Sequence, residues 1–202
     1  ADVFTTRNQR FANIRMSMFI VEGPSTFNER LLARYILSQN NDNRMRRWLL
    51  TQVLSTYYHD YVRHMLEAEL LRRIYDIAEA GTPITASVLS ATQGDILNEF
   101  WDGLVEVDEG ARLTWMRQPH YYMGLYPYTY SAGLTCSTLM AQAIDEEGQP
   151  AVDRWLEVLK AGGSLKPLEL MRRAGIDLED PATIRKAVDY VGRLVDEVDK
   201  SF

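Results

Sequence analysis

The chain has 202 residues, which is long enough for one or two domains with a substantial core. Hydrophobic residues make up 46% and charged residues 25%, an ordinary globular composition, and no run of 18 apolar residues is present to span a membrane. The balance of 28 acidic to 22 basic residues argues against a nucleic-acid partner. A single cysteine, Cys136, excludes an internal disulfide and gives no support for secretion, so we expect a cytoplasmic protein with Cys136 as a core thiol.

Residues 12–38 carry apolar side chains at helical spacing and predict the first long helix. Pro24 has no backbone N–H, so it would either kink this helix or mark a restart after Gly23. Residues 40–42, Asn-Asn-Asp, predict a turn and the N-cap of the next helix.

Residues 42–80 contain neither proline nor glycine and predict one long helix, or two helices joined at a bend, ended by Gly81. His59 and His64 lie on this segment. Their spacing of five places them about 140° apart on an α-helix, which disfavours a shared metal. We therefore interpret both as structural or surface histidines.

Thr85 predicts the N-cap of a helix that runs to about Phe100, and Asp102-Gly103 predicts a turn. Residues 104–116 are the only strand-like segment. Further capped helices are predicted over residues 128–144, 150–160, 167–175 and 181–198. The apolar residues of the last helix predict its core face: Ile184, Val188, Val191, Leu194, Val195 and Val198. The expected fold class is all-α, with long antiparallel helices and at most a short strand-like segment near 104–116.

The most informative stretch is Phe19-Ile20-Val21-Glu22-Gly23-Pro24-Ser25-Thr26-Phe27-Asn28-Glu29. Ser25 follows Glu22 by three positions and Glu29 follows it by seven. On a helix, these spacings place the three side chains on one face, surrounded by apolar residues. A carboxylate removed from water needs a cation or several hydrogen bonds. Glu22 would therefore bind a metal or, in the simpler interpretation, pair with an arginine such as Arg15.

The order of residues from Val21 to Glu29 resembles the helix with the third zinc ligand in the oligoendopeptidase F family of thimet-oligopeptidase-like zinc metallopeptidases. In that family an H-E-x-x-H helix supplies two histidine ligands and a general-base glutamate. The resemblance implies that Glu22 is a zinc ligand and that Ser25 and Glu29 support it.

A second stretch, Pro119 to Gly133, places five tyrosines and one histidine within eleven residues, interrupted by Gly124 and Pro127. It predicts a loop that enters a helix, and a generic aromatic-rich turn is the alternative interpretation. Phenols and an imidazole are suitable donors to an oxyanion. The stretch resembles the P-H-F-Y-x-x-F-Y-x-Y-x-Y-A-T-G segment of the same family, which contacts substrate and transition state. That resemblance implies catalytic roles for the residues at matching positions: His120, Tyr126, Tyr128 and Tyr130.

A third stretch extends the resemblance from about Met18 to about Val198. Leu159-Lys160-Ala161-Gly162-Gly163-Ser164, Pro167-Leu168-Glu169-Leu170 and Ala174-Gly175-Ile176-Asp177 match the family pattern of L-K-x-G-G-S, P-x-E-L-L and A-G-x-D. No H-E-x-x-H occurs in the 202 residues. We therefore expect residues 1–202 to be the C-terminal part of a catalytic domain whose H-E-x-x-H helix lies upstream.

The resemblance implies a zinc-dependent endopeptidase that hydrolyses short peptides, with one catalytic Zn²⁺. The expected partners are oligopeptide substrates and the N-terminal part of the same enzyme, with no nucleic acid, no membrane and a possible homo-oligomer. Because two histidine ligands and the general base are absent from the 202 residues, we expect them alone to be inactive. Two alternatives stay open: a non-catalytic helical module that binds peptides, and a structural helical bundle without a ligand.

Overall fold

The computed structural model describes residues 1–39, 42–117 and 119–201. Its regular elements are all helices, with no strand among the described residues, which confirms the all-α prediction. The chain divides into two compact units. The first is Ala1–Tyr61 with Thr129–Phe202, and the second is Val62–Tyr128. No described helix is both long enough and apolar enough to cross a bilayer.

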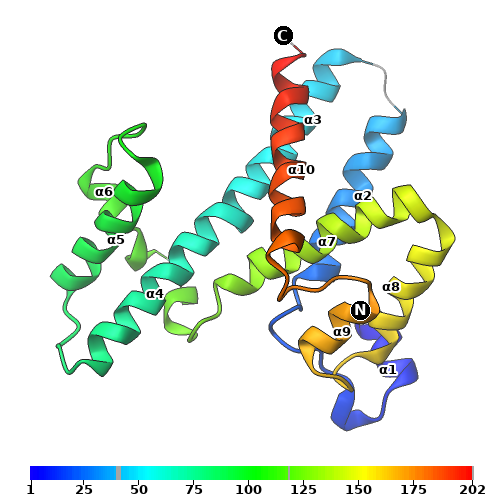
Figure 1. Cartoon of the computed structure of the whole chain (residues 1–202), viewed down its shortest axis with the longest axis horizontal. Coiled ribbons are helices and arrows are strands. Elements are labelled where there is room, and N and C mark those ends of the chain that lie inside the picture. Colours follow the sequence, from blue (N-terminus) through cyan, green and yellow to red (C-terminus); the bar gives the residue numbers. More distant parts are fainter. Residues whose placement is uncertain (40–41, 118, 202) are drawn as a thin grey trace. The chain divides into compact units, whose positions relative to one another are not determined.

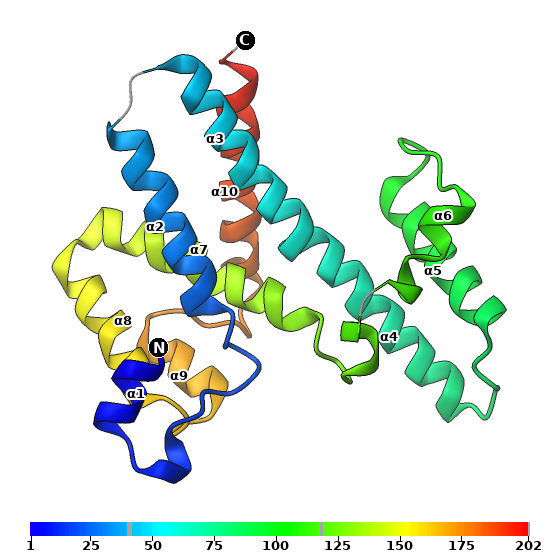
Figure 2. The ribbon, with the colours of Figure 1, turned by 180° about the vertical axis from the view of Figure 1, so that it is seen from behind.

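The first unit is built from seven labelled helices (Figures 1 and 2). They are α1 (Asp2–Asn8), α2 (Gly23–Gln39), α3 (Asn43–Thr56), α7 (Tyr128–Glu147, apart from its first residue), α8 (Gln149–Ala161), α9 (Pro167–Arg173) and α10 (Pro181–Asp199). Helix α3 packs against α2 and α10, and α8 packs against α1 and α9. A short 3₁₀ helix spans Phe11–Asn13.

Two apolar clusters hold the first unit together. The larger one centres on α7 and α8, where Phe27 of α2 packs against Trp155 with ring centroids 5.1 Å apart. The smaller one joins α3, α7 and α10 through Leu50, Leu134 and Leu194. Burial of these side chains supplies the main driving force for folding of the unit.

The first long helix is shorter than predicted. Helix α2 begins at Gly23, and residues 14–22 are turns and irregular backbone, so the prediction of a helix from residue 12 is wrong. Pro24 occupies the first turn of α2, where a missing N–H costs nothing. Of the two readings of Pro24, the restart after Gly23 is therefore the correct one.

The predicted helix over residues 42–80 is continuous but not uniform. It consists of α3, a π-helix over Tyr57–Arg63 and α4 (His64–Glu79), and Gly81 follows with a positive φ of 82°. A π-helix closes i→i+5 hydrogen bonds, so the α-helical angle applied to His59 and His64 does not hold. Asp42 caps α3 by accepting from the Arg44 N–H, whereas residues 40 and 41 of the predicted turn lie outside the described residues.

The second unit contains α4, α5 (Ala86–Trp101) and α6 (Glu109–Arg112), with 3₁₀ helices over Thr114–Met116 and Pro119–Tyr122 (Figure 1). Thr85 caps α5, as predicted, by accepting from the Val88 N–H at 3.3 Å. Asp102 and Gly103 both have positive φ and form the predicted turn. The predicted strand-like segment near 104–116 is wrong, because it folds as a loop and short helices against α5.

The core face of α10 is rotated from the prediction. Leu194 is buried, and Val191 and Val198 pack beside it in the smaller cluster. Ile184, Val188 and Val195 are exposed instead.

The glycines of the third motif have a structural role. The Gly163 N–H donates to the Asn13 carbonyl at 2.9 Å, and a Cβ on Gly163 would lie 2.2 Å from the Arg15 carbonyl oxygen. The N-terminal segment therefore packs directly on the backbone that follows α8.

Candidate active site

Glu22 directly precedes α2, and the N-terminal turn of that helix fixes its backbone. Its carbonyl accepts from the Thr26 N–H at 3.0 Å and from the Thr26 hydroxyl at 2.9 Å. The same hydroxyl oxygen lies 3.0 Å from Ser137 Oγ of α7, in a buried position. The Glu22 side chain is half-buried, and Ser25 is exposed one position before Thr26.

Glu29 of α2, seven residues after Glu22, lies in a cluster of acidic groups. Burial, then the charges of Asp60 and Glu22, raise the pKa of Glu29 above its usual value. Asp60 is itself bound to His59, with Nδ1 and Oδ1 2.6 Å apart. The sequence pattern predicted Glu22 and Glu29 together, but it gave no indication of Asp60, which comes from a distant segment.

The start of α7 is tied to the π-helix within the first unit. The Ser131 hydroxyl lies 3.2 Å from the Asp60 carbonyl oxygen and 3.0 Å from the Tyr61 carbonyl oxygen. Tyr130, the preceding residue, is half-buried on α7. The bonds of Ser131 therefore hold Tyr130 and the backbone of Asp60 in a defined arrangement.

The histidine and tyrosine loop of the second unit has the predicted form. A 3₁₀ turn over Pro119–Tyr122 leads through a glycine turn into α7, whose first residue is Tyr128. The rings of His120 and Tyr126 have centroids 5.2 Å apart, so these two predicted residues lie side by side.

A buried polar network lies under this loop, and sequence reasoning missed it. His64 has its ring centroid 6.1 Å from that of His120, and its Nε2 is 4.0 Å from Glu67. Arg63 donates to the same carboxylate at 3.2 Å. Burial, then the Glu67 charge, raise the pKa of Tyr121 far above its usual value.

Glu67 and His64 are 2% and 1% exposed, so the network forms part of the interior of the second unit. Their spacing of three on an apolar helix face was the available signal, because a buried carboxylate needs a partner. The interpretation of His64 as structural is consistent with this burial, whereas His59 is exposed.

The family model described as "Peptidase family M3" matches residues 2–190 of the 202. The chain belongs to peptidase family M3. Oligopeptidase PepF of Bacillus subtilis (strain 168) is 32% identical over 198 residues, which cover 98% of this chain and 29% of that protein. The plasmid oligoendopeptidase F of Lactococcus lactis subsp. cremoris is 28% identical over 197 residues, covering 98% of this chain and 33% of that protein.

A solved structure agrees with these relatives. The crystal structure of oligoendopeptidase-F from Enterococcus faecium has a TM-score of 0.83 and 30% identity, and the match covers 92% of this chain and 36% of that one. The family resemblance read from the three sequence stretches is thereby confirmed. The chain spans about a third of the length of these relatives.

Cys136 belongs to the larger apolar cluster of the first unit. Its side chain is fully buried on α7, and burial raises the pKa of the thiol to about 12. A thiol nucleophile needs an accessible, easily ionised sulfur. The interpretation of Cys136 as a core thiol is therefore confirmed.

Proposed function

We propose that residues 1–202 are the C-terminal portion of a zinc-dependent oligopeptidase that hydrolyses peptide bonds in short peptides. The observation that carries the proposal is the Val21–Glu29 motif, fixed at the start of α2 by Thr26 and Ser137. Membership of family M3 supports the reaction class. Its partners would be oligopeptide substrates and the remainder of the same enzyme.

The residues of the first unit fit the carboxylate part of a metal site. Glu22, Glu29 and Asp60 are close enough for their charges to raise the pKa of Glu29. Gathering carboxylates in this way is unfavourable unless a cation offsets their repulsion. Glu22 would be the ligand, with Glu29 and Ser25 supporting it, and the two histidine ligands would come from outside the 202 residues. When bound, zinc supplies Lewis-acid activation of the peptide carbonyl.

The loop residues would act on the substrate. His120 and the hydroxyls of Tyr126, Tyr128 and Tyr130 are hydrogen-bond donors suited to an oxyanion that develops at the scissile carbonyl. The pairing of His120 with Tyr126 and the buried network under them support a preorganised donor set. Preorganised donors stabilise developing charge without reorganising during the reaction.

Zinc content of the full-length protein tests the assignment of Glu22. Glu22→Gln should lose zinc and peptidase activity together, and Glu29→Gln should weaken zinc binding by about 10–100-fold, as for residues that orient a ligand. Glu79→Gln, at an exposed position of α4, is the matched control and should keep both properties. Full zinc occupancy in the Glu22→Gln protein would contradict the assignment.

An assay with a quenched fluorescent peptide tests the role of the 202 residues. We expect the chain by itself to be inactive with or without added zinc, because Glu22 alone cannot hold a catalytic zinc. A full-length protein that binds peptides but neither binds zinc nor cleaves them would instead indicate a peptide-binding module.

A further inference from the structure

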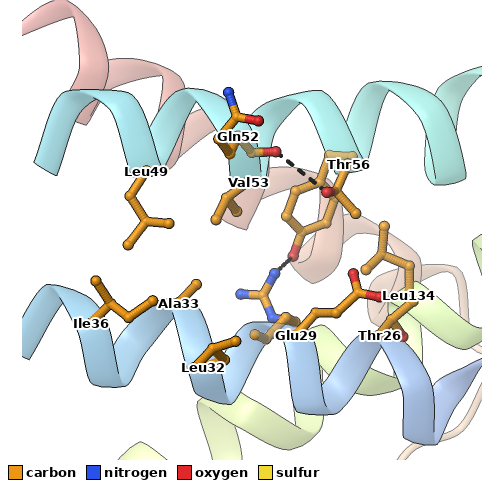
Figure 3. Close-up of a pocket in the computed structure, with 12 residues that line it drawn as sticks. Thr26, Glu29, Leu32, Ala33, Ile36, Leu49, Gln52, Val53, Thr56 and Leu134 are labelled. Carbon is orange, nitrogen blue, oxygen red and sulfur yellow. Dashed lines mark hydrogen bonds between the residues drawn. The ribbon is translucent and has the colours of Figure 1, made fainter. Parts of the chain in front are cut away.

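A cavity of about 190 Å³ lies between α2 and α3 in the first unit. Figure 3 shows that Ala33 and Ile36 of α2 face Leu49 and Val53 of α3 across it. Leu32, also in the lining, is 59% exposed, so the cavity opens to solvent at its rim. Most of the wall is therefore an apolar surface formed by two helices.

Arg30 also lines this cavity, and it is a buried cation. Its side chain is 7% exposed, and its guanidinium lies 5.2 Å from the ring centroid of Tyr57 and 4.6 Å from that of Tyr190. One terminal nitrogen donates to the Tyr57 hydroxyl, whereas Nε is buried without a hydrogen-bond partner among the described residues. No described carboxylate forms an ion pair with it.

Tyr57 does not neutralise Arg30. Its hydroxyl also bonds Thr138 Oγ1 at 2.6 Å, and burial raises its pKa well above the usual value, so the phenol stays uncharged. Buried charges in proteins are normally paired. The guanidinium of Arg30 therefore contacts uncharged groups at the wall of an open cavity, and Glu29, which lines the same cavity, forms no ion pair with it among the described residues.

From this arrangement we propose that the cavity binds a monocarboxylate with a compact apolar group. A guanidinium binds a carboxylate through a fork of parallel hydrogen bonds, and Arg30 has donors left for such a ligand. The apolar wall of Ala33, Ile36, Leu49 and Val53 would enclose the ligand's hydrocarbon part.

Two features narrow the ligand class. An apolar cavity of about 150 Å³ in another protein accommodates a benzene molecule, so this cavity suits one ring or one branched aliphatic group. Glu29 lines the same cavity, and its negative charge repels a dianion such as phosphate more strongly than it repels a monocarboxylate. The proposal does not depend on zinc or on peptidase activity.

Calorimetric titration of the 202-residue chain tests the proposal with benzoate and 4-methylpentanoate. Each should bind at one saturable site. Benzamide and 4-methylpentanamide match them in shape but lack the charge, and we expect them to bind at least tenfold more weakly. Equal binding of an acid and its amide, or no saturable binding of either acid, would overturn the proposal.

Two variants test whether the acids bind in this cavity. Arg30→Gln should weaken acid binding at least tenfold, and Ala33→Phe should abolish binding by filling the cavity while it keeps Arg30. Arg44→Gln, on the exposed surface of α3, is the charge-matched control and should bind like the parent chain. Circular dichroism confirms that each variant is folded. Unchanged binding in folded Arg30→Gln or Ala33→Phe would also overturn the proposal.

The carboxylate could come from a free acid or from the C-terminus of a peptide, which share this chemistry. N-acetylleucine and a leucine-ended tripeptide, each compared with its C-terminal amide, separate the two sources. Tighter binding of the peptide acid than of 4-methylpentanoate would identify peptide C-termini as the ligand. Binding of the small acids alone would identify free carboxylates.

Discussion

Gly133 of α7 lies directly against the backbone of Glu22. A Cβ placed on Gly133 would be 2.9 Å from the Glu22 carbonyl carbon and 2.8 Å from the Gly23 nitrogen, closer than side chains approach backbone. The absence of a side chain at Gly133 is therefore what allows α7 to meet the start of α2. The position of Glu22 depends on this contact.

Gly133→Ala should displace Glu22 and lower zinc content and activity in the full-length protein. Overpacking of a well-packed contact typically costs about 1–3 kcal/mol in the free energy of unfolding. Metal analysis and urea unfolding measure the two effects. Gly192→Ala is the matched control, because a Cβ there meets nothing within 4 Å and should leave zinc content unchanged. Equal zinc content in both variants would show that the position of Glu22 does not depend on its contact with Gly133.

His120→Ala and Tyr130→Phe should lower kcat of the full-length enzyme much more than they raise KM. Donors to a developing oxyanion act mainly in the transition state, and loss of one typically costs about 10²–10³ in rate. Steady-state kinetics on a fluorescent peptide provide the measurement. Tyr122→Phe changes an exposed tyrosine of the same loop and should have little effect. A rise in KM alone would mean that the loop binds substrate without stabilising the transition state.

Glu67→Gln should weaken the second unit, because Arg63 and His64 would lose the charge they face inside it. Loss of a charged hydrogen-bond partner at a buried position costs about 1–3 kcal/mol. Amide hydrogen exchange should rise in α4 and α5, with smaller changes in α8. The comparison variant is Glu79→Gln, exposed on the same helix. Unchanged exchange in α4 would rule out a stabilising role for the network.

Gly163→Ala should reduce the urea midpoint of the first unit. The new methyl group would collide with the Arg15 carbonyl, and the N-terminal segment would have to move. We expect the free energy of unfolding of the first unit to fall by about 1–3 kcal/mol. Ser164→Ala, at the adjacent exposed position, should change stability by no more than about 0.5 kcal/mol. A loss of similar size in both variants would point to the loop itself and not to the contact with Arg15.

Acid should weaken the link between α4 and α5 in the second unit. Arg73 bonds Glu69 at 2.7 Å and Glu99 at 2.6 Å. Hydrogen bonds from Arg72, then Arg73, lower the pKa of Glu69 to about 2, and Arg73 lowers the pKa of Glu99. Because the folded-state pKa is depressed, this stabilisation is present above about pH 4.5 and is lost as the pH falls toward 2.

Arg73→Met tests this link. The variant should have a lower urea midpoint than the parent at pH 7, and the difference should shrink as the pH falls from 4.5 toward 2. Arg185→Met, on the exposed surface of α10, should match the parent over the same range. A difference that does not vary with pH would mean that Arg73 stabilises the unit through its hydrocarbon chain.

The sequence by itself determined where several helices begin and which family the chain resembles. Thr85 and the Asp180-Pro181 pair begin helices where predicted, because a side-chain cap or a proline in the first turn is a local effect. The motif around Glu22 was recognisable for a similar reason: its residues lie within one short stretch. Local hydrogen bonding and backbone restriction are readable from neighbouring residues alone.

Only the tertiary structure decided the features that depend on contacts between residues far apart in the sequence. Residues 104–116 have strand-like composition, but an isolated strand leaves its backbone hydrogen-bonding groups unpaired. In the structure, the short helices of this segment pack against α5. The burial of Arg30 follows from the aromatic side chains brought to it by the π-helix and α10. The start of α2 at Gly23 coincides with its contact to Gly133, more than one hundred residues away. Such contacts follow from packing between segments, which no local pattern encodes.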